Sequence, residues 1–196
     1  MPRLDVSRIS TGYSSSHPVL NDLSLSVDDG GRLALVGASG SGKTTLALSL
    51  IALLKARGLR VGTIKHAHHG FDVDVPGKDS FRHREAGADE VLVASNRRIA
   101  LMIEDPLPEA DDRRTLNDLL PRLGRVDVVV VEGFKNGAHA KLEVFRPDTG
   151  KPRLAGEVAN IIAVAAPASA AIDGSLPVFD LDQPEAWIDD LLALFG

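Results

Sequence analysis

The sequence of 196 residues predicts an α/β fold of three layers, with helices on a mainly parallel β-sheet and an antiparallel hairpin as an extension at its edge. Apolar strand-like segments alternate along the chain with segments of helical spacing, which is typical of parallel sheets. Residues 127–131 predict a strand buried on both faces, because their β-branched run at 128–131 has no polar alternation. A glycine-rich loop at residues 37–44 joins an apolar run to a helical segment. The length favours a single domain over residues 1–196.

The composition excludes several classes of protein and of chemistry. Hydrophobic residues make up 44% of the chain and charged residues 25%, which fits a globular protein with its own core. There is no cysteine, so disulfides, zinc-thiolate sites and cysteine nucleophiles are excluded. The formal net charge of −5 argues against nucleic acid and anionic membranes as partners. The longest apolar stretch, residues 161–172, contains Pro167 and is shorter than the ~20 residues that span a bilayer. We therefore expect a cytoplasmic protein with no membrane span.

The first third of the chain predicts strands around the glycine loop. Residues 4–6 indicate a short first strand, and the alternation in residues 23–27 indicates a half-buried second one. The turn residues that follow predict a hairpin between residues 23–27 and the strand at residues 33–36. The helix after the loop is expected to stop at Gly58, because glycine favours the left-handed conformation that ends helices. Residues 60–65 predict the next strand.

The rest of the chain predicts further alternation of helices and strands. Residues 66–78 are polar and contain glycine, which predicts a loop, and Asp79 or Ser80 can cap the helix that follows. The remaining predicted elements are paired strands at 91–94 and 99–103, a helix at 116–123, a strand at 127–131, an edge strand at 141–146, short strands at 161–165 and 178–179, and a last helix at 187–194.

The glycine loop matches the phosphate-binding pattern G-x-x-x-x-G-K-[ST] without a mismatch. Its glycines let backbone N–H groups converge on one anion, and the helix that follows adds the positive end of its dipole. Lys43 is expected at the outer phosphates, the Thr44 hydroxyl at Mg²⁺ and Thr45 at an inner phosphate. The flanking strand and helix disfavour a glycine-rich turn that binds nothing. The sequence therefore predicts a P-loop NTPase fold. The residues predicted to bind the nucleotide are Gly37, Ser39, Gly40, Ser41, Gly42, Lys43, Thr44, Thr45, Lys65 and His66.

Glu132 follows the apolar strand at residues 127–131 and is the candidate catalytic residue. A buried parallel strand that ends in a carboxylate delivers it to the edge of the sheet where phosphates bind. There Glu132 can hold Mg²⁺ together with Thr44, or orient an attacking water molecule. The alternative is an acidic residue that merely ends a strand. Asp127, at the opposite end of that strand, is expected to be a solvent-facing terminus with no role in the site.

The polar loop after residues 60–65 carries both cationic and acidic side chains. Lys65, His66 and His68 can donate to phosphates, and Asp72 or Asp74 can approach Mg²⁺. A transition-metal site in the histidine cluster is disfavoured, because neighbouring side chains of an extended chain point apart. A solvated polar loop without a ligand is the other alternative.

The segment from Leu33 to Ala165 resembles the MobB family of adapter proteins in molybdopterin guanine dinucleotide biosynthesis. The phosphate loop alone is shared by many families, whereas the segments from Lys65 to Ala88 and from Val131 to Lys135 are far more specific. The segments that carry the resemblance are residues 37–44, 64–88, 91–98, 128–135, 141–146 and 161–165.

This resemblance implies a protein that binds GTP with Mg²⁺, is at most a weak Mg-dependent GTPase and forms a homodimer. It implies a guanylyltransferase partner that joins GMP to molybdopterin, and it brings molybdopterin into consideration as a further ligand. It places the GTP phosphates on residues 40–45 and Mg²⁺ near Thr44 and Glu132. Members often carry a small residue and an aspartate after the late apolar strand, where this chain has Ala165-Ala166-Pro167.

The first ~45 residues resemble a different family, the ABC transporter ATPases, through residues 4–13, 18–27 and 37–46. In that family an aromatic at the position of Tyr13 stacks on adenine. The chain is thus expected to combine an ABC-like N-terminal β extension (1–32) with a MobB-like core (33–196). The L-S-G-G-Q signature of ABC domains is missing from the sequence. An ATP-binding module of ABC type without that signature is the alternative function. A small P-loop kinase ranks last, since Arg82 and Arg84 are the only local candidates for its lid.

Overall fold

The computed structural model describes residues 4–14, 17–27, 31–67, 70–106 and 114–195, with the backbone alone described up to residue 27. The chain forms two compact units, one of residues 1–66 and 115–196 and the other of residues 67–114. Across the described ranges, every helix is too short or too polar to cross a membrane.

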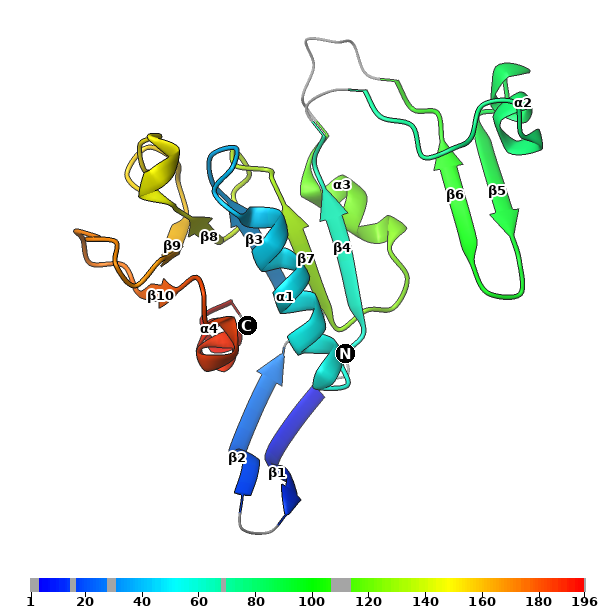
Figure 1. Ribbon diagram of the computed structural model, residues 1–196. Helices are drawn as coiled ribbons and strands as arrows, with labels where there is room; N and C mark the ends of the chain where they lie inside the picture. The colour runs from blue at the N-terminus through cyan, green and yellow to red at the C-terminus, as the bar shows by residue number, and fades with distance from the viewer. Residues whose placement is uncertain (1–3, 15–16, 28–30, 68–69, 107–113, 196) are drawn as a thin grey trace. The chain divides into compact units, whose positions relative to one another are not determined.

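The larger unit is built on a parallel sheet of six strands in the order β10-β9-β8-β3-β7-β4 (Figure 1). Every pair of neighbours in this sheet is parallel. The predicted α/β class is therefore confirmed. The strands are β3 (Gly31–Val36), β4 (Val61–Lys65), β7 (Val128–Glu132), β8 (Lys141–Val144), β9 (Ile161–Ala166) and β10 (Val178–Asp180).

Helices pack on both faces of this sheet and make the three layers. On one face, Leu33 and Leu35 of β3 pack with Leu50 of α1 (Lys43–Ala56) and Ile188 of α4 (Ile188–Phe195). On the other face, the alternate residues Ala34, Val129 and Val131 pack with Leu116 of α3 (Leu116–Leu119). Because β7 contributes side chains to both clusters, its unbroken β-branched run is explained. The 3₁₀ segments are η1 (Leu120–Arg122), η2 (Pro147–Thr149) and η3 (Pro184–Ala186).

The predicted edge position of residues 141–146 is wrong, because β8 lies inside the sheet between β3 and β9. Lys141 and Glu143 gave the segment a polar alternation, yet both side chains are buried. The Lys141 ammonium donates to the carbonyl oxygens of Gly137, His139 and Ala159. Burial lowers the pKa of Lys141, and these three acceptors offset part of the cost of burying its charge. Glu143 likewise accepts hydrogen bonds from the N–H groups of Leu154 and Ala155, so both charged side chains have polar partners inside the sheet.

The predicted hairpin between residues 23–27 and 33–36 is also wrong. β2 (His17–Val27) pairs in antiparallel fashion with β1 (Leu4–Ser14), and β3 pairs with β7 and β8 instead. The N-terminal segment thus forms a hairpin of its own. The turn signal identified a reversal of the chain but not the strands that pair around it, since pairing in a sheet depends on residues distant in sequence.

The smaller unit contains α2 (Asp79–Glu85) and an antiparallel hairpin of β5 (Glu90–Ala94) and β6 (Ile99–Ile103). The helix and the paired strands lie where the sequence predicts them. α2 packs against β5, where Val91 is buried. Leu92 stands opposite Leu101 in the hairpin, and Ala94 stands opposite Ile99 on the same face, where all four side chains are exposed. One face of this hairpin is therefore uncovered within its unit.

Candidate functional site

The phosphate loop lies between β3 and α1, at the carboxyl edge of the parallel sheet. Gly37, Gly40 and Gly42 have φ angles of 152°, 83° and 94°, a region that favours glycine. A Cβ on Gly37 would lie 2.3 Å from the carbonyl oxygen of Val144 and 2.8 Å from Ser41 Oγ. Only glycine fits there. The loop conformation therefore depends on the residue type that the motif specifies.

Two polar side chains of the loop face its interior. Ser41 is only 1% exposed, and its hydroxyl has no hydrogen-bond partner among the described residues. The Lys43 ammonium folds back and donates to the carbonyl oxygens of Gly37 (2.9 Å) and Ala38 (2.7 Å). Burial lowers the pKa of Lys43, while the negative charge of Glu132 opposes this shift. Among the described residues, the loop thus holds one buried hydroxyl without a hydrogen-bond partner and one cation without a carboxylate within ion-pair distance.

The remaining predicted loop residues are open to solvent. Ser39, Gly40, Thr44 and Thr45 are exposed, whereas the apolar residues that follow in α1 are buried. The mouth of the loop is therefore accessible to a ligand, and its base is anchored in the core.

Glu132 lies beside the loop as its place at the end of β7 predicts. Its Oε1 accepts a hydrogen bond of 2.9 Å from the Thr44 hydroxyl and lies 3.5 Å from the Lys65 ammonium. The parallel register places Lys65 of β4 and Leu35 of β3 on either side of Glu132. The structure thus brings together three predicted site residues, Thr44 from the start of α1 and Lys65 and Glu132 from the ends of β4 and β7.

His66 and the segment after β7 form the neighbouring wall. The backbone N–H of His66 donates to the Glu132 carbonyl oxygen at 2.9 Å, and the His66 ring lies 4.8 Å from the Phe134 ring. A Cβ on Gly133 would lie 2.9 Å from His66 Cβ, so glycine permits this close approach. Phe134 adopts a φ of 55°, which is uncommon for a residue with a side chain. These contacts fix the ends of β4 and β7 against each other.

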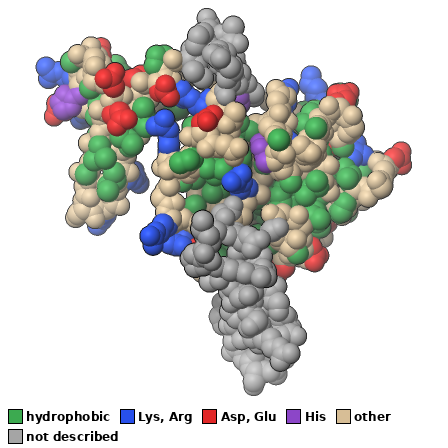
Figure 2. Space-filling view, turned by 180° about the vertical axis from the view of Figure 1, so that it is seen from behind, with side chains coloured by type: hydrophobic (Ala, Val, Ile, Leu, Met, Phe, Trp, Pro, Cys, Tyr) green, Lys and Arg blue, Asp and Glu red, His purple; other side chains and the backbone are tan. Residues whose placement is uncertain are grey.

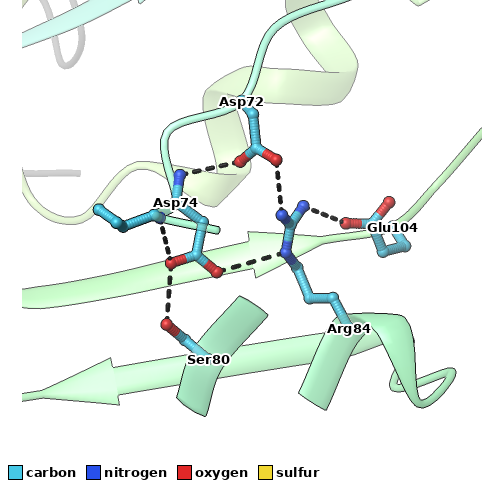
Figure 3. A network of polar contacts seen from close by, with 6 residues as sticks. Asp72, Asp74, Ser80, Arg84 and Glu104 are labelled. Atoms are coloured by element: carbon cyan, nitrogen blue, oxygen red, sulfur yellow. Dashed lines mark hydrogen bonds and ion pairs between the residues drawn. The ribbon is translucent and has the colours of Figure 1, made fainter. Parts of the chain in front are cut away.

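Asp72 and Asp74, the other candidate Mg²⁺ ligands, belong to the smaller unit and lie around Arg84 (Figure 3). Arg84 Nη2 is 2.7 Å from Asp72 Oδ2, Nη1 is 2.9 Å from Glu104 Oε1, and Nε is 3.5 Å from Asp74 Oδ2. A hydrogen bond from the Asp74 N–H and the Arg84 guanidinium lower the pKa of Asp72. The network ties the loop before α2 to the helix and to the end of β6. His68, the third candidate phosphate donor, lies outside the described residues.

Asp127 and Arg60 form an ion pair at the opposite, amino edge of the sheet. Asp127 Oδ1 lies 2.6 Å from Arg60 Nη2, and Arg60 lowers the pKa of Asp127 by hydrogen bonding to it. The acidic residues at the two ends of β7 thus have different surroundings, since Glu132 lies at the phosphate loop and Asp127 lies at the opposite edge of the sheet.

Arg146 also lies beside the phosphate loop, and the sequence did not identify it. Its Nε lies 3.4 Å from the position that a Cβ on Gly42 would occupy, and its Nη2 lies 3.0 Å from Asp182 Oδ1. Arg146 follows β8, and β8 lies next to β3 in the sheet. The position of Arg146 at the phosphate loop depends on this pairing, which the sequence did not predict. A parallel interior strand puts the residues after its carboxyl end at the ligand edge of the sheet.

A short stretch of the chain is similar to transporter ATPases. It is 57% identical over 44 residues to a multidrug efflux ATP-binding/permease protein of Mycobacterium bovis. This match covers 22% of the present chain and 4% of the transporter.

A much longer stretch is similar to proteins of molybdenum cofactor synthesis. The family model for molybdopterin guanine dinucleotide synthesis protein B (MobB) matches residues 32–167. The chain is 42% identical over 158 residues to the molybdopterin-guanine dinucleotide biosynthesis adapter protein of Escherichia coli, which covers 80% of this chain and 89% of that protein. A crystal structure of molybdopterin-guanine biosynthesis protein B matches with a TM-score of 0.64 at 29% identity, covering 84% of this chain and 98% of the other. The chain therefore belongs to the MobB family.

Proposed function

We propose that this protein is a GTP-binding adapter that supports the synthesis of molybdopterin guanine dinucleotide. The observation that carries the proposal is the phosphate loop of residues 37–44 with Thr44, Lys65 and Glu132 beside it, in a chain 42% identical to such an adapter. The buried Ser41 hydroxyl and the inward-folded Lys43 ammonium are groups that phosphate oxygens would satisfy. As an adapter of this kind, the protein would have a guanylyltransferase as its partner and molybdopterin as a candidate ligand.

The residues at the loop also fit Mg²⁺. Thr44 Oγ1 and Glu132 Oε1 are both hard oxygen donors, and they lie 2.9 Å apart. Two neighbouring ligands of an octahedral Mg²⁺ site with bonds of about 2.0–2.1 Å are about 3 Å apart. Thr44 and Glu132 would therefore hold the ion, which supplies positive charge against the phosphates when it is bound. Because Glu132 also faces Lys65, we propose that hydrolysis is weak.

Replacing Glu132 with glutamine is expected to leave GTP affinity within about threefold and to lower any GTP hydrolysis about tenfold or more. The substitution keeps the shape and the hydrogen bond from Thr44 but removes the negative charge that holds Mg²⁺. Phosphate release and nucleotide titration at several Mg²⁺ concentrations measure both effects. Asp127→Asn is the matched control, because it neutralises the acid at the other end of β7. Unchanged hydrolysis in Glu132→Gln would remove Glu132 from the reaction.

Nucleotide selectivity is the direct test of the proposed function. We expect GTP with Mg²⁺ to stabilise the protein against heat more than ATP does at equal concentration, because a ligand stabilises the state it binds. Thermal shifts with GTP, ATP and their diphosphates provide the comparison, and calorimetry provides the affinities. Preferential stabilisation by ATP would contradict GTP as the ligand.

An ATP-binding module is the second candidate function, and the 44-residue similarity to a transporter ATPase favours it. β9 ends at Ala166 with Pro167 after it, so no carboxylate stands at this strand end to pair with a guanine edge. Adenine stacked on Tyr13 would be the corresponding base contact. The same selectivity measurement separates the two functions.

We further propose that the protein is a homodimer joined through the uncovered face of the β5–β6 hairpin. Leu92, Ile99 and Leu101 on this face are 61%, 69% and 50% exposed, and hydrophobic side chains are visible on the surface of this unit (Figure 2). A two-stranded sheet is marginally stable by itself, so one that α2 alone covers, among the described residues of its unit, gains from a second layer. A second copy is the favoured occupant, because the apolar patch of Leu92, Ile99 and Leu101, with Glu90 at its edge, is complementary to itself across a twofold axis.

A further inference from the structure

Arg146 occupies a fixed place at the carboxyl edge of the sheet. It directly precedes η2, and its carbonyl oxygen accepts hydrogen bonds from the Thr149 N–H (3.2 Å) and the Thr149 hydroxyl (2.8 Å). Two residues earlier, the Val144 carbonyl lies against Gly37 of the phosphate loop. The backbone next to Arg146 therefore packs against the phosphate loop.

The Arg146 side chain points to the start of α1. Its Nε lies 3.4 Å from the position of a Cβ on Gly42, the residue that caps this helix, so the guanidinium packs where Gly42 has no side chain. Asp182, which follows β10, accepts a hydrogen bond of 3.0 Å from Nη2. Within the described residues, Nε and Nη1 have no hydrogen-bond partner, and the side chain is 34% exposed. One side of the guanidinium is thus held, and the other remains available as a donor.

The start of α1 is also where a phosphate would be bound. The first N–H groups of a helix have no partner within the helix and lie at the positive end of its dipole. The buried Ser41 hydroxyl directly before this helix start has no partner among the described residues, which independently indicates a missing polar ligand. A guanidinium adds two parallel donors of fixed geometry that match phosphate oxygens.

We propose that Arg146 is a phosphate-contacting residue of the nucleotide site, positioned by Asp182. This inference rests on the proposed nucleotide binding and adds to it a residue that follows β8, on the side of β3 away from Glu132. Glu132 and Lys65 approach the loop from β7 and β4, whereas Arg146 approaches it from the neighbouring strand on the other side. A bound phosphate chain is then flanked by Arg146 on the β8 side of the loop strand and by Lys65 of β4, which lies beyond β7, on the other side.

The test compares Arg146→Ala with Arg60→Ala in the full chain. Arg60 is the matched control, because it is also an arginine paired with an aspartate but lies at the amino edge of the sheet. We expect Arg146→Ala to weaken binding of both GTP and ATP by about 10- to 100-fold, the range for one charged hydrogen-bonded contact, and Arg60→Ala to leave both unchanged. Arg146→Lys keeps the charge without the paired donors and is expected to recover part of the loss.

The results separate this inference from the proposed function. Equal affinities of Arg146→Ala and Arg60→Ala for a triphosphate that the wild-type chain binds would overturn the role of Arg146 and leave the proposed function standing. A loss for only one of the two nucleotides would also overturn it, because a phosphate contact is common to both. If the wild-type chain prefers ATP, GTP is contradicted as the ligand. The affinities of the Arg146 and Arg60 variants are then compared with ATP. A wild-type chain that binds neither nucleotide would overturn both statements. Thermal unfolding of each variant without nucleotide shows whether a loss of affinity reflects a loss of folded protein.

Discussion

Replacing Lys43 with alanine is expected to weaken triphosphate binding about a hundredfold or more. The Lys43 ammonium lies over the phosphate loop and, in the described part of the chain, bonds to the neutral carbonyl oxygens of Gly37 and Ala38. Exchanging these acceptors for charged phosphate oxygens makes the hydrogen bonds charge-assisted at both ends. The substitution removes this gain and leaves the backbone N–H groups of the loop, the Ser41 hydroxyl and the proposed Arg146 contact as donors.

Isothermal calorimetry or a fluorescent GTP analogue measures this loss. Lys55→Ala is the matched control, because Lys55 lies in the last turn of the same helix and bonds to the Leu59 carbonyl. Both variants are expected to retain the circular dichroism of the wild-type protein. Undiminished affinity in Lys43→Ala would place the nucleotide elsewhere on the protein.

Replacing Leu101 with glutamate is expected to convert the proposed dimer into monomers. Leu101 stands opposite Leu92 on the uncovered hairpin face, and a twofold interface would bring the introduced carboxylates of the two copies close together. Burying like charges without partners costs several kcal/mol, which is enough to dissociate a dimer of moderate affinity. Light scattering coupled to gel filtration, at a series of protein concentrations, measures the change in mass.

Leu48→Glu is the control for this experiment. Leu48 is 63% exposed on α1, so the same substitution there adds the same charge at a surface with no proposed partner. We expect the wild-type protein and Leu48→Glu to have the mass of a dimer and Leu101→Glu that of a monomer. A wild-type protein that stays monomeric at every concentration, or a dimeric Leu101→Glu, would show that this face is not the interface.

The phosphate loop and Glu132 were predictable because each has a signal within a few residues of sequence. The loop needs glycines at fixed spacing between a strand and a helix, and Glu132 needs only to end a strand buried on both faces. The parallel register then places Glu132 next to Lys65. Local patterns thus determined which residues face the ligand edge of β4, β3 and β7.

The parts that sequence reasoning missed depend on contacts between distant residues. Alternation of polar and apolar residues predicted an edge position for β8, but the partners of Glu143 are the N–H groups of Leu154 and Ala155, which lie in the connection to β9. The sequence of the strand itself does not indicate that such partners exist. The place of Arg146 depended on the same error, since its neighbours Gly42 and Asp182 are far from it in sequence. The pairing of β2 with β1 was missed for a related reason, because a turn signal does not identify the partner strand.

The two buried charges of β8 select one alignment of this strand. A shift of one residue would turn Lys141 and Glu143 to the opposite face of the sheet, away from the carbonyls and N–H groups that satisfy them. An ion left buried without such partners costs several kcal/mol, so misaligned pairings of β8 with β3 or β9 are strongly disfavoured. An all-apolar strand would pair almost as well after such a slip. The alignment of β8 with β3 also fixes the position of the Val144 carbonyl along the sheet, where it lies against Gly37. The buried charges of β8 thereby determine where the phosphate loop begins to turn.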